Sequence, residues 1–464
     1  MYVAGLCGEG QGPPAACIQT AVNAGPLLMT GTGRQTTQLL SLGGLGTEKK
    51  QNVQESESPT RSNPTSTDRK LTEHRKRSAG EFSHEGIVFS NGERWKLMRT
   101  FTFKTLKDYG FGKKGFEGKM QEEARCVVEE LRRSQGQPMN PTKCFTNAFV
   151  NLVCSVVFGE RFDYSDKRFT KLISIVDEIF RTMSSTWGQI YSIFPPMRYI
   201  PGPHHKAAAV SEELLVLMAE IVKSCQETLD PEKPRHFVDC FLIRIEKEKN
   251  DPRTQFTMES LLYALHSVFM GASDTVSTTL RHALLIFLKY PEVENKIREE
   301  IDRVIGRDRL PEMDDRLNMP YTQAVMHEVQ RFSDIAPLDL PHLVTKDVQF
   351  RGYFIPKGTD IYPLLCTVHR DPTQFATPYK FNPNHFLDEN GQFKKNDAWM
   401  PFSAGKRICP GEYMARMEFF ITLTTILQNF TLSSEKEFTE DEVAPKLTGF
   451  LNSPIQYELC FIPR

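Results

Sequence analysis

The chain has 464 residues, 39% of them hydrophobic and 25% charged, so it can bury a large core and has the composition of an ordinary globular protein. Its 57 lysines and arginines balance 58 aspartates and glutamates, which gives a formal net charge of -1. This balance provides no global attraction to nucleic acid or to an anionic surface, and we expect no nucleic-acid partner.

The cysteines and the apolar runs restrict the class of protein further. The ten cysteines are scattered from Cys7 to Cys460 without a CxxC pair, which argues against a disulfide framework or a zinc site and favours a reducing compartment. No stretch approaches the roughly 18 consecutive apolar residues that a membrane-spanning helix needs. We therefore expect no anchor helix and no signal peptide in this sequence.

Residues 1–85 predict a disordered, low-complexity segment. They are rich in Gly, Gln, Ser, Thr and Pro and poor in aromatic residues, so they cannot bury enough apolar surface to offset the entropy lost on ordering. The basic cluster at 69–78 has two interpretations, a targeting signal or a solvated linker, of which we favour the linker.

From residue 86 onward the apolar residues recur at spacings of three and four, which predicts a domain made mainly of α-helices over 86–464. The longest candidate helix spans 258–290, and its apolar pattern is interrupted by small and polar residues at 271–279. Short runs typical of β-strands appear only late, at 342–350, 353–365 and 457–463. We predict a mainly α fold with small β-sheets.

The sequence PFSAGKRICPGE at 401–412 predicts a metal-binding cysteine. A thiolate ligand needs groups that stabilise its negative charge, and the backbone N–H groups of Gly405 and Gly411, together with a helix that begins just after Cys409, would supply them. Arg407 offers a cation and Phe402 an aromatic shield from water. The alternative is a buried structural cysteine followed by a helix.

Several segments of the chain, taken together, resemble the cytochrome P-450 superfamily, and in particular the vertebrate microsomal enzymes of family 2, nearest to the coumarin-hydroxylase and olfactory subfamilies. The segments are FSNGERW, FGERFDY, FLIRI, HEVQRF, FIPKGT, FNPNHFLDENGQFKKNDA and PFSAGKRICPGE. The resemblance covers 86–464 and implies the cytochrome P-450 fold, haem b as cofactor and Cys409 as the ligand of its iron. Residues 1–85 match neither the anchor nor the first helix and strands of that family, so the strands at 344–354 and 359–364 are expected to lack partners.

The resemblance also assigns haem-binding and structural residues. Trp95 and Arg99 lie four residues apart on one helix face, and the resemblance implies that both contact the haem edge. It adds His342 as a partner of a haem propionate. Glu328 and Arg331, one helical turn apart, are expected to form an ion pair, and His385 stands where the superfamily usually has arginine; the implied role of these three, Glu328, Arg331 and His385, is structural.

The polar interruption of the long helix contains the expected catalytic residues. The resemblance implies that Thr275 and Asp274 organise protons for dioxygen at the haem, whereas the alternative from the residues alone is a helix kink with satisfied hydrogen bonds. Ala272 follows Gly271 where the family more often has Ala-Gly, and its methyl group is expected to narrow the oxygen groove. The implied substrate pocket consists of Phe180, Phe269, Ile335, Ala336, Leu338 and Leu451.

The resemblance implies a monooxygenase that acts on small apolar molecules. Electrons would come from NADPH through a separate reductase, with cytochrome b5 as a further partner, since no dinucleotide fingerprint follows a strand. The implied location is the cytosolic face of the endoplasmic reticulum membrane. Two alternatives stay open: a haem-thiolate isomerase or dehydratase, and a non-catalytic truncated chain.

Overall fold

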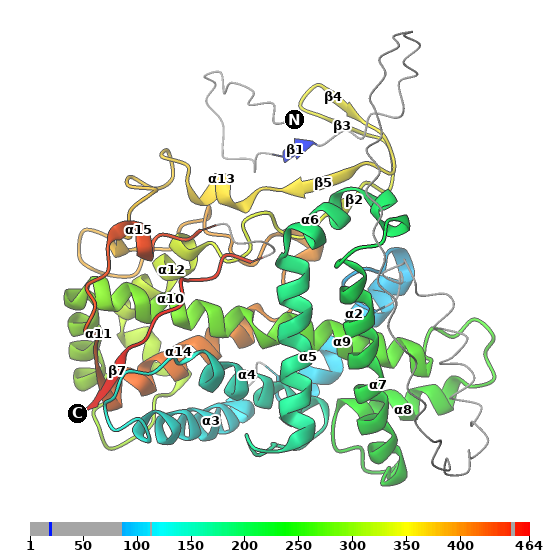
Figure 1. Ribbon diagram of the computed structural model, residues 1–464, viewed down its shortest axis with the longest axis horizontal. Coiled ribbons are helices and arrows are strands. Elements are labelled where there is room, and N and C mark those ends of the chain that lie inside the picture. The colour runs from blue at the N-terminus through cyan, green and yellow to red at the C-terminus, as the bar shows by residue number, and fades with distance from the viewer. Residues whose placement is uncertain (1–17, 21–85, 112–113, 447–450) are drawn as a thin grey trace, which may run out of the picture.

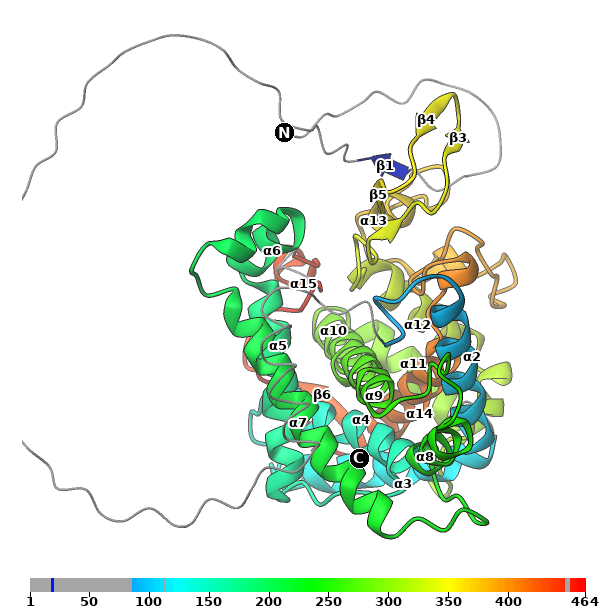
Figure 2. The same ribbon diagram turned by 90° about the vertical axis from the view of Figure 1, so that its right-hand side faces the viewer.

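The structure is a computed structural model that describes residues 18–20, 86–111, 114–446 and 451–464. The predictions for 1–17 and for 21–85, including the basic cluster, lie outside the described residues. The fold is mainly helical with a few short strands, as predicted from the sequence (Figures 1 and 2).

The α-helices of the described residues follow in chain order. They are α2 (Gly92–Asp108), α3 (Lys114–Arg132), α4 (Thr142–Val157), α5 (Lys167–Ser184), α6 (Thr186–Ile193), α7 (His205–Glu227), α8 (Phe237–Glu248), α9 (Met258–Ser273), α10 (Thr275–Lys289), α11 (Pro291–Val304), α12 (Pro320–Ser333), α13 (Leu365–His369), α14 (Glu412–Asn429) and α15 (Glu440–Val443). Their starts carry the expected signals. For example, Thr257 caps α9 in a capping box with Ser260, and α11 and α12 begin at prolines.

Three helices supply the centre of the core. Nearly every residue of α4 and α10 is buried, as is the interior of α14, as expected for helices that are apolar on all sides. Helix α10 packs against α4, α12 and α14, and Figure 2 shows α9 and α10 end-on among the surrounding helices. No helix within the described ranges is long and apolar enough to cross a membrane.

The long helix predicted over 258–290 is two helices that follow one another across the molecule (Figure 1). The break lies at Asp274, whose φ and ψ are -114° and -23°. Hydroxyl groups on both sides of it bond back to the preceding turn: Ser273 donates to the carbonyl of Phe269, and Thr275 to that of Gly271. Such bonds bend helices, so the polar interruption seen in the sequence coincides with the break.

The strands form three small sheets. Strand β5 (Asp360–Pro363) lies between β1 (Ile18–Thr20) and β2 (His342–Leu343), and both neighbours are antiparallel to it. Strands β3 (Val348–Phe350) and β4 (Tyr353–Ile355) pair as a hairpin, and β6 (Phe430–Ser433) pairs with β7 (Cys460–Pro463). The expectation that the strand at 359–364 lacks partners is therefore wrong for β5, because β1 supplies the backbone groups that pair with its edge.

Candidate functional site

The cysteine predicted as a metal ligand lies at the end of a tight loop. The N–H of Cys409 donates to the carbonyl of Phe402 at 2.8 Å, which closes the loop over the 3-10 helix η4 (Gly405–Arg407). Gly405 has φ +71°, a conformation that glycine adopts without steric cost. Helix α14 then begins at Glu412, three residues after Cys409, as expected from the sequence.

The surroundings of the Cys409 sulfur suit a metal ligand. The side chain is accessible from outside the protein, yet the protein around it is dense enough that burial raises the pKa of its thiol. The Gly411 N–H, which bonds the sulfur, and the Arg99 cation lower that pKa, whereas Glu412 and Asp339 raise it. An accessible sulfur with one N–H donor and one cation is suited to coordination, because a bound metal ion deprotonates a coordinating thiol.

Three side chains near this loop are suited to hold an anionic group. The guanidinium carbon of Arg407 lies 4.0 Å from the centre of the Trp95 ring and that of Arg99 at 5.8 Å, and Arg99 donates to the carbonyl of Ile408. The indole N–H of Trp95 is buried and has no hydrogen-bond partner within the described part of the chain. A buried donor without a partner is costly. The haem propionates implied by the sequence would satisfy it, so these residues fit the cofactor.

His342, the other expected propionate partner, lies in β2. Its backbone pairs with Ile361 of β5, and its side chain is half-buried.

The break between α9 and α10 leaves one side of the helix open. Gly271 is exposed, and a Cβ atom built there would meet no atom within 4 Å. Thr275 donates to the Gly271 carbonyl at 3.0 Å, and Ala272 is half-buried. Burial raises the pKa of Asp274, and the Arg281 cation and the hydroxyl of Thr278, 3.2 Å from the carboxylate, oppose that rise. The expected catalytic pair thus lies at the helix break, next to the exposed Gly271.

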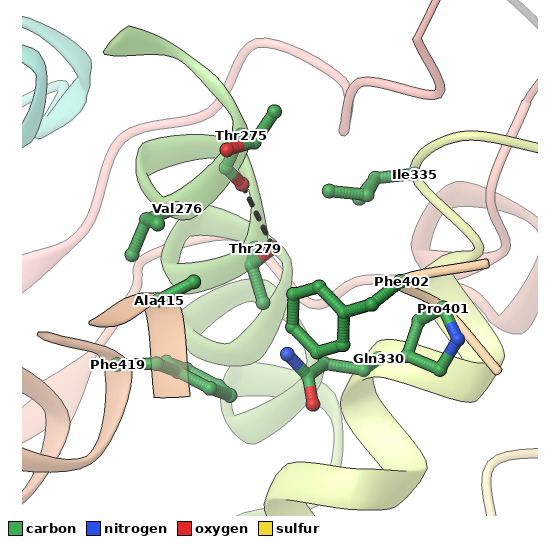
Figure 3. A pocket seen from close by; sticks show the side chains of 9 residues that line it. All are labelled: Thr275, Val276, Thr279, Gln330, Ile335, Pro401, Phe402, Ala415 and Phe419. Atoms are coloured by element: carbon green, nitrogen blue, oxygen red, sulfur yellow. Dashed lines mark hydrogen bonds between the residues drawn. The ribbon is translucent and has the colours of Figure 1, made fainter. Parts of the chain in front are cut away.

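Helices α10, α12 and α14 and the cysteine loop line one small cavity that is partly open to solvent (Figure 3). Its walls are Thr275, Val276, Thr279, Gln330, Ile335, Pro401, Phe402, Ala415 and Phe419. The cavity therefore joins Thr275, Ile335 and Phe402, which the sequence analysis had assigned to three different roles. Sequence reasoning missed Gln330, although it lies between the two members of the expected ion pair.

The other expected pocket residues divide into two groups. Leu338 is exposed and Ala336 half-buried, whereas Phe180 and Leu451 are buried. Phe269 has no exposed surface and stacks on Phe158 with a centroid distance of 5.6 Å. In this structure Phe269 packs in the core, because the face of α9 that carries it points toward α4.

Glu328, Arg331 and His385 form one buried cluster. Arg331 donates to both carboxylate oxygens of Glu328 at 2.7 Å, and Nδ1 of His385 lies 3.2 Å from the same carboxylate. Arg331 also donates to the carbonyls of residues 369, 378 and 380. The cluster ties α12 to the segment before the cysteine loop, and it contacts neither the cavity nor Cys409.

The mainly helical fold, the accessible cysteine on a loop before a helix and the cations beside a buried indole agree with the class of protein that the sequence resembles. The chain belongs to the cytochrome P-450 family, whose pattern matches residues 60–461. The match begins within the segment 1–85, where the sequence analysis had found no resemblance.

Relatives with names of family 2 support the narrower resemblance. Cytochrome P-450 2F2 of Mus musculus is 49% identical over 376 residues, which cover 81% of this chain and 77% of that protein. Cytochrome P-450 2B2 of Rattus norvegicus is 48% identical over 384 residues, covering 82% and 78%. Cytochrome P-450 2G1 of Oryctolagus cuniculus is 47% identical over 384 residues, which cover 82% of this chain and 78% of that protein. The predicted family is confirmed.

Proposed function

We propose that this chain is a haem-thiolate monooxygenase that inserts one oxygen atom of O2 into small apolar substrates, such as xenobiotics, steroids or fatty acids. The observation that carries the proposal is that the cysteine loop and the start of α10 line the same cavity, with Phe402 on one wall and Thr275 on the other (Figure 3). Family membership supports the haem monooxygenase class.

Two sets of residues would hold haem b, one at its iron and one at its propionates. Cys409 would bind the iron, and Trp95, Arg99, Arg407 and His342 would hold the propionates. Bound haem supplies the activation of O2, which protein side chains alone do not perform. The contribution of the loop is the sulfur, the Gly411 N–H that bonds it and the Phe402 ring that limits water beside it.

Thr275 and Asp274 would hold and move protons. The Thr275 hydroxyl donates to Gly271 at 3.0 Å and keeps its oxygen free to accept from a water molecule. Because burial raises the pKa of Asp274, its carboxyl group binds a proton more readily near neutral pH than an exposed aspartate does. This pair distinguishes the proposal from an isomerase or dehydratase, which needs no delivered protons from solvent.

The cavity favours apolar substrates. Its walls carry no charged side chain, and its polar groups are Thr275, Thr279 and Gln330. Thr279 uses its hydroxyl to donate to the Thr275 carbonyl at 2.8 Å. A pocket of this kind holds a ligand mainly by burial of apolar surface.

The protein surface offers places for the proposed partners. Lys96 and Lys406 are exposed near the cysteine loop and, with Arg94, are candidates to dock an acidic reductase or cytochrome b5. Exposed apolar side chains on α6, on η1 (Pro195–Tyr199) and on the β2–β4 region suit contact with the endoplasmic reticulum membrane. They are Trp187, Ile190, Phe194, Tyr199, Ile200, Leu343, Tyr353 and Phe354.

The reduced carbon-monoxide difference spectrum of the full chain, with its haem content, tests the proposal. A strongly red-shifted Soret band is expected from thiolate ligation, and NADPH with added reductase should then oxidise small apolar substrates. Haem binding without turnover by reductase, but with rearrangement of organic peroxides, would indicate the isomerase class. A chain that binds no haem would contradict the proposal and indicate a non-catalytic protein.

A further inference from the structure

Asp339 and Ser403 connect the cysteine loop to the segment that follows α12. The Ser403 hydroxyl donates to Oδ2 of Asp339 at 2.5 Å, and the other carboxylate oxygen accepts from the N–H of Leu340 at 2.8 Å. The two residues are 64 positions apart in the chain, so this bond joins two segments that are distant in the sequence. Ser403 immediately follows Phe402, whose carbonyl accepts the Cys409 N–H.

Both residues have a positive φ, a backbone conformation that residues other than glycine rarely adopt. Asp339 has φ +51° and Ser403 has φ +63°, in the left-handed region that is sterically unfavourable for a non-glycine residue. Aspartate tolerates this region better than serine because its side chain can bond locally. Two such residues bonded to each other are held by the tertiary structure, and conformations of this kind occur preferentially where function needs them.

The bond also holds a charged group at the cysteine loop. Asp339 is one of three charged groups that act on Cys409, together with Glu412 and the Arg99 cation. Glu412 belongs to the first turn of α14 and pairs with Arg416 at 3.4 Å. Asp339 comes from a different part of the chain, and its hydrogen bond to Ser403 fixes where its charge lies.

We propose that Asp339 is a positioning residue: its hydrogen bond to Ser403 holds the cysteine loop in place and keeps a carboxylate at that loop, which lowers the reduction potential of haem bound there. The inference rests on the haem-thiolate function proposed above. A nearby negative charge stabilises the ferric state relative to the ferrous state, which has one positive charge fewer on the iron. The potential in turn decides how readily a reductase transfers the first electron.

A double-substitution cycle tests the clamp without need of haem. Glycine fits both positive-φ positions, so Asp339→Gly and Ser403→Gly remove the side chains without adding strain. Urea unfolding of the full-length parent, both single variants and the double variant gives the coupling between the two sites. We expect the double variant to differ from the sum of the single effects, because the second substitution has no bond left to break. Additive effects would overturn the clamp.

Asp339→Asn separates the charge from the bond. Asparagine tolerates the left-handed region, its oxygen can accept from the Leu340 N–H, and its NH2 group can donate to the Ser403 hydroxyl oxygen. The carbon-monoxide spectrum should therefore keep its red-shifted band while the reduction potential moves to a more positive value. A control is Asp388→Asn, since Asp388 is exposed and accepts from N–H groups of its own turn; its potential should equal that of the parent.

An Asp339→Asn potential equal to that of the parent would overturn the electrostatic role. A parent that gives no red-shifted band would instead contradict the proposed function, and the unfolding cycle would still decide the clamp. The two failures are therefore distinguishable.

Discussion

The side chains of Arg331 and Glu328 form a bidentate ion pair in which neither exposes any surface to solvent. The two N···O distances are both 2.7 Å, and the remaining Arg331 donors reach the carbonyls of residues 369, 378 and 380. One guanidinium group thereby joins α12 to three points of the chain that precede the cysteine loop. Arginine can make all these bonds because its planar guanidinium group carries five N–H donors in a rigid arrangement, which the ammonium group of lysine lacks.

Removal of this guanidinium should destabilise the whole domain. Arg331→Met keeps much of the volume but leaves the Glu328 carboxylate buried without its cation, which costs about 3–5 kcal/mol. Urea unfolding of the purified chain measures the loss. The matched control is Arg133→Met, whose exposed partner Glu130 lies 2.6 Å away; an exposed pair contributes at most about 1 kcal/mol. Equal losses in the two variants would contradict the structural role.

Cys409→Ser should abolish thiolate ligation and monooxygenation while the chain stays folded, because the loop is closed by backbone bonds that serine preserves. The reduced carbon-monoxide spectrum should lose its red-shifted band. Cys126→Ser on α3, whose side chain is half-buried, provides the control and should keep the band. A red-shifted band in the Cys409 variant would exclude this sulfur as the ligand.

Thr275→Ala should retain haem but release more of the consumed oxygen as peroxide, since the hydroxyl bonded to Gly271 is lost. Proton delivery by a positioned group typically contributes about 10²–10⁴-fold in rate, so product formation should fall far more than NADPH consumption. Thr275→Ser restores a hydroxyl and should recover most of the coupling. Parallel assays of peroxide, product and NADPH measure this coupling. Unchanged coupling in the alanine variant would contradict the proton-delivery role of Thr275.

The stability of the fold should fall on acidification because buried histidines stay neutral. Nδ1 of His327 lies 2.7 Å from the Gln323 carbonyl, and Nε2 lies 2.8 Å from a guanidinium nitrogen of Arg416, so Nε2 must be the acceptor. Burial lowers the pKa of His327 to about 3, from 6.5, and that of His282 to about 4. At pH values between these lowered pKa values and about 6.5, the unfolded chain therefore binds more protons than the folded chain.

The contribution of His327 is complete above about pH 6.5 and is lost as the pH falls toward 3. Over this window the free energy of unfolding should drop by about 1.4 kcal/mol per pH unit for each such histidine. His327→Gln removes one titrating group and should make the pH dependence shallower, as measured by urea unfolding at pH 4.5, 5.5 and 7.5. An identical slope in variant and parent would contradict the buried neutral state.

The fold class, the place of the cysteine loop and the ion pair in α12 were predicted from the sequence alone. These are local features: apolar spacings of three and four define helices, and the glycines and the helix start around Cys409 lie within a dozen residues of one another. The sequence also located the polar interruption at 271–279. It predicted one helix across this interruption, and the structure breaks it at Asp274, where the hydroxyl groups of Ser273 and Thr275 bond to the preceding turn.

Contacts between groups that are distant in the sequence depend on the tertiary structure. The resemblance assigns Phe269 to the substrate pocket, and the structure adds that its ring stacks on Phe158. The strand at 18–20 pairs with β5 across more than three hundred residues, a contact that no local pattern specifies. The bond between Asp339 and Ser403 likewise depends on how α12 and the cysteine loop pack, because hydrogen bonds between distant loops are fixed by the packing of the elements that carry them.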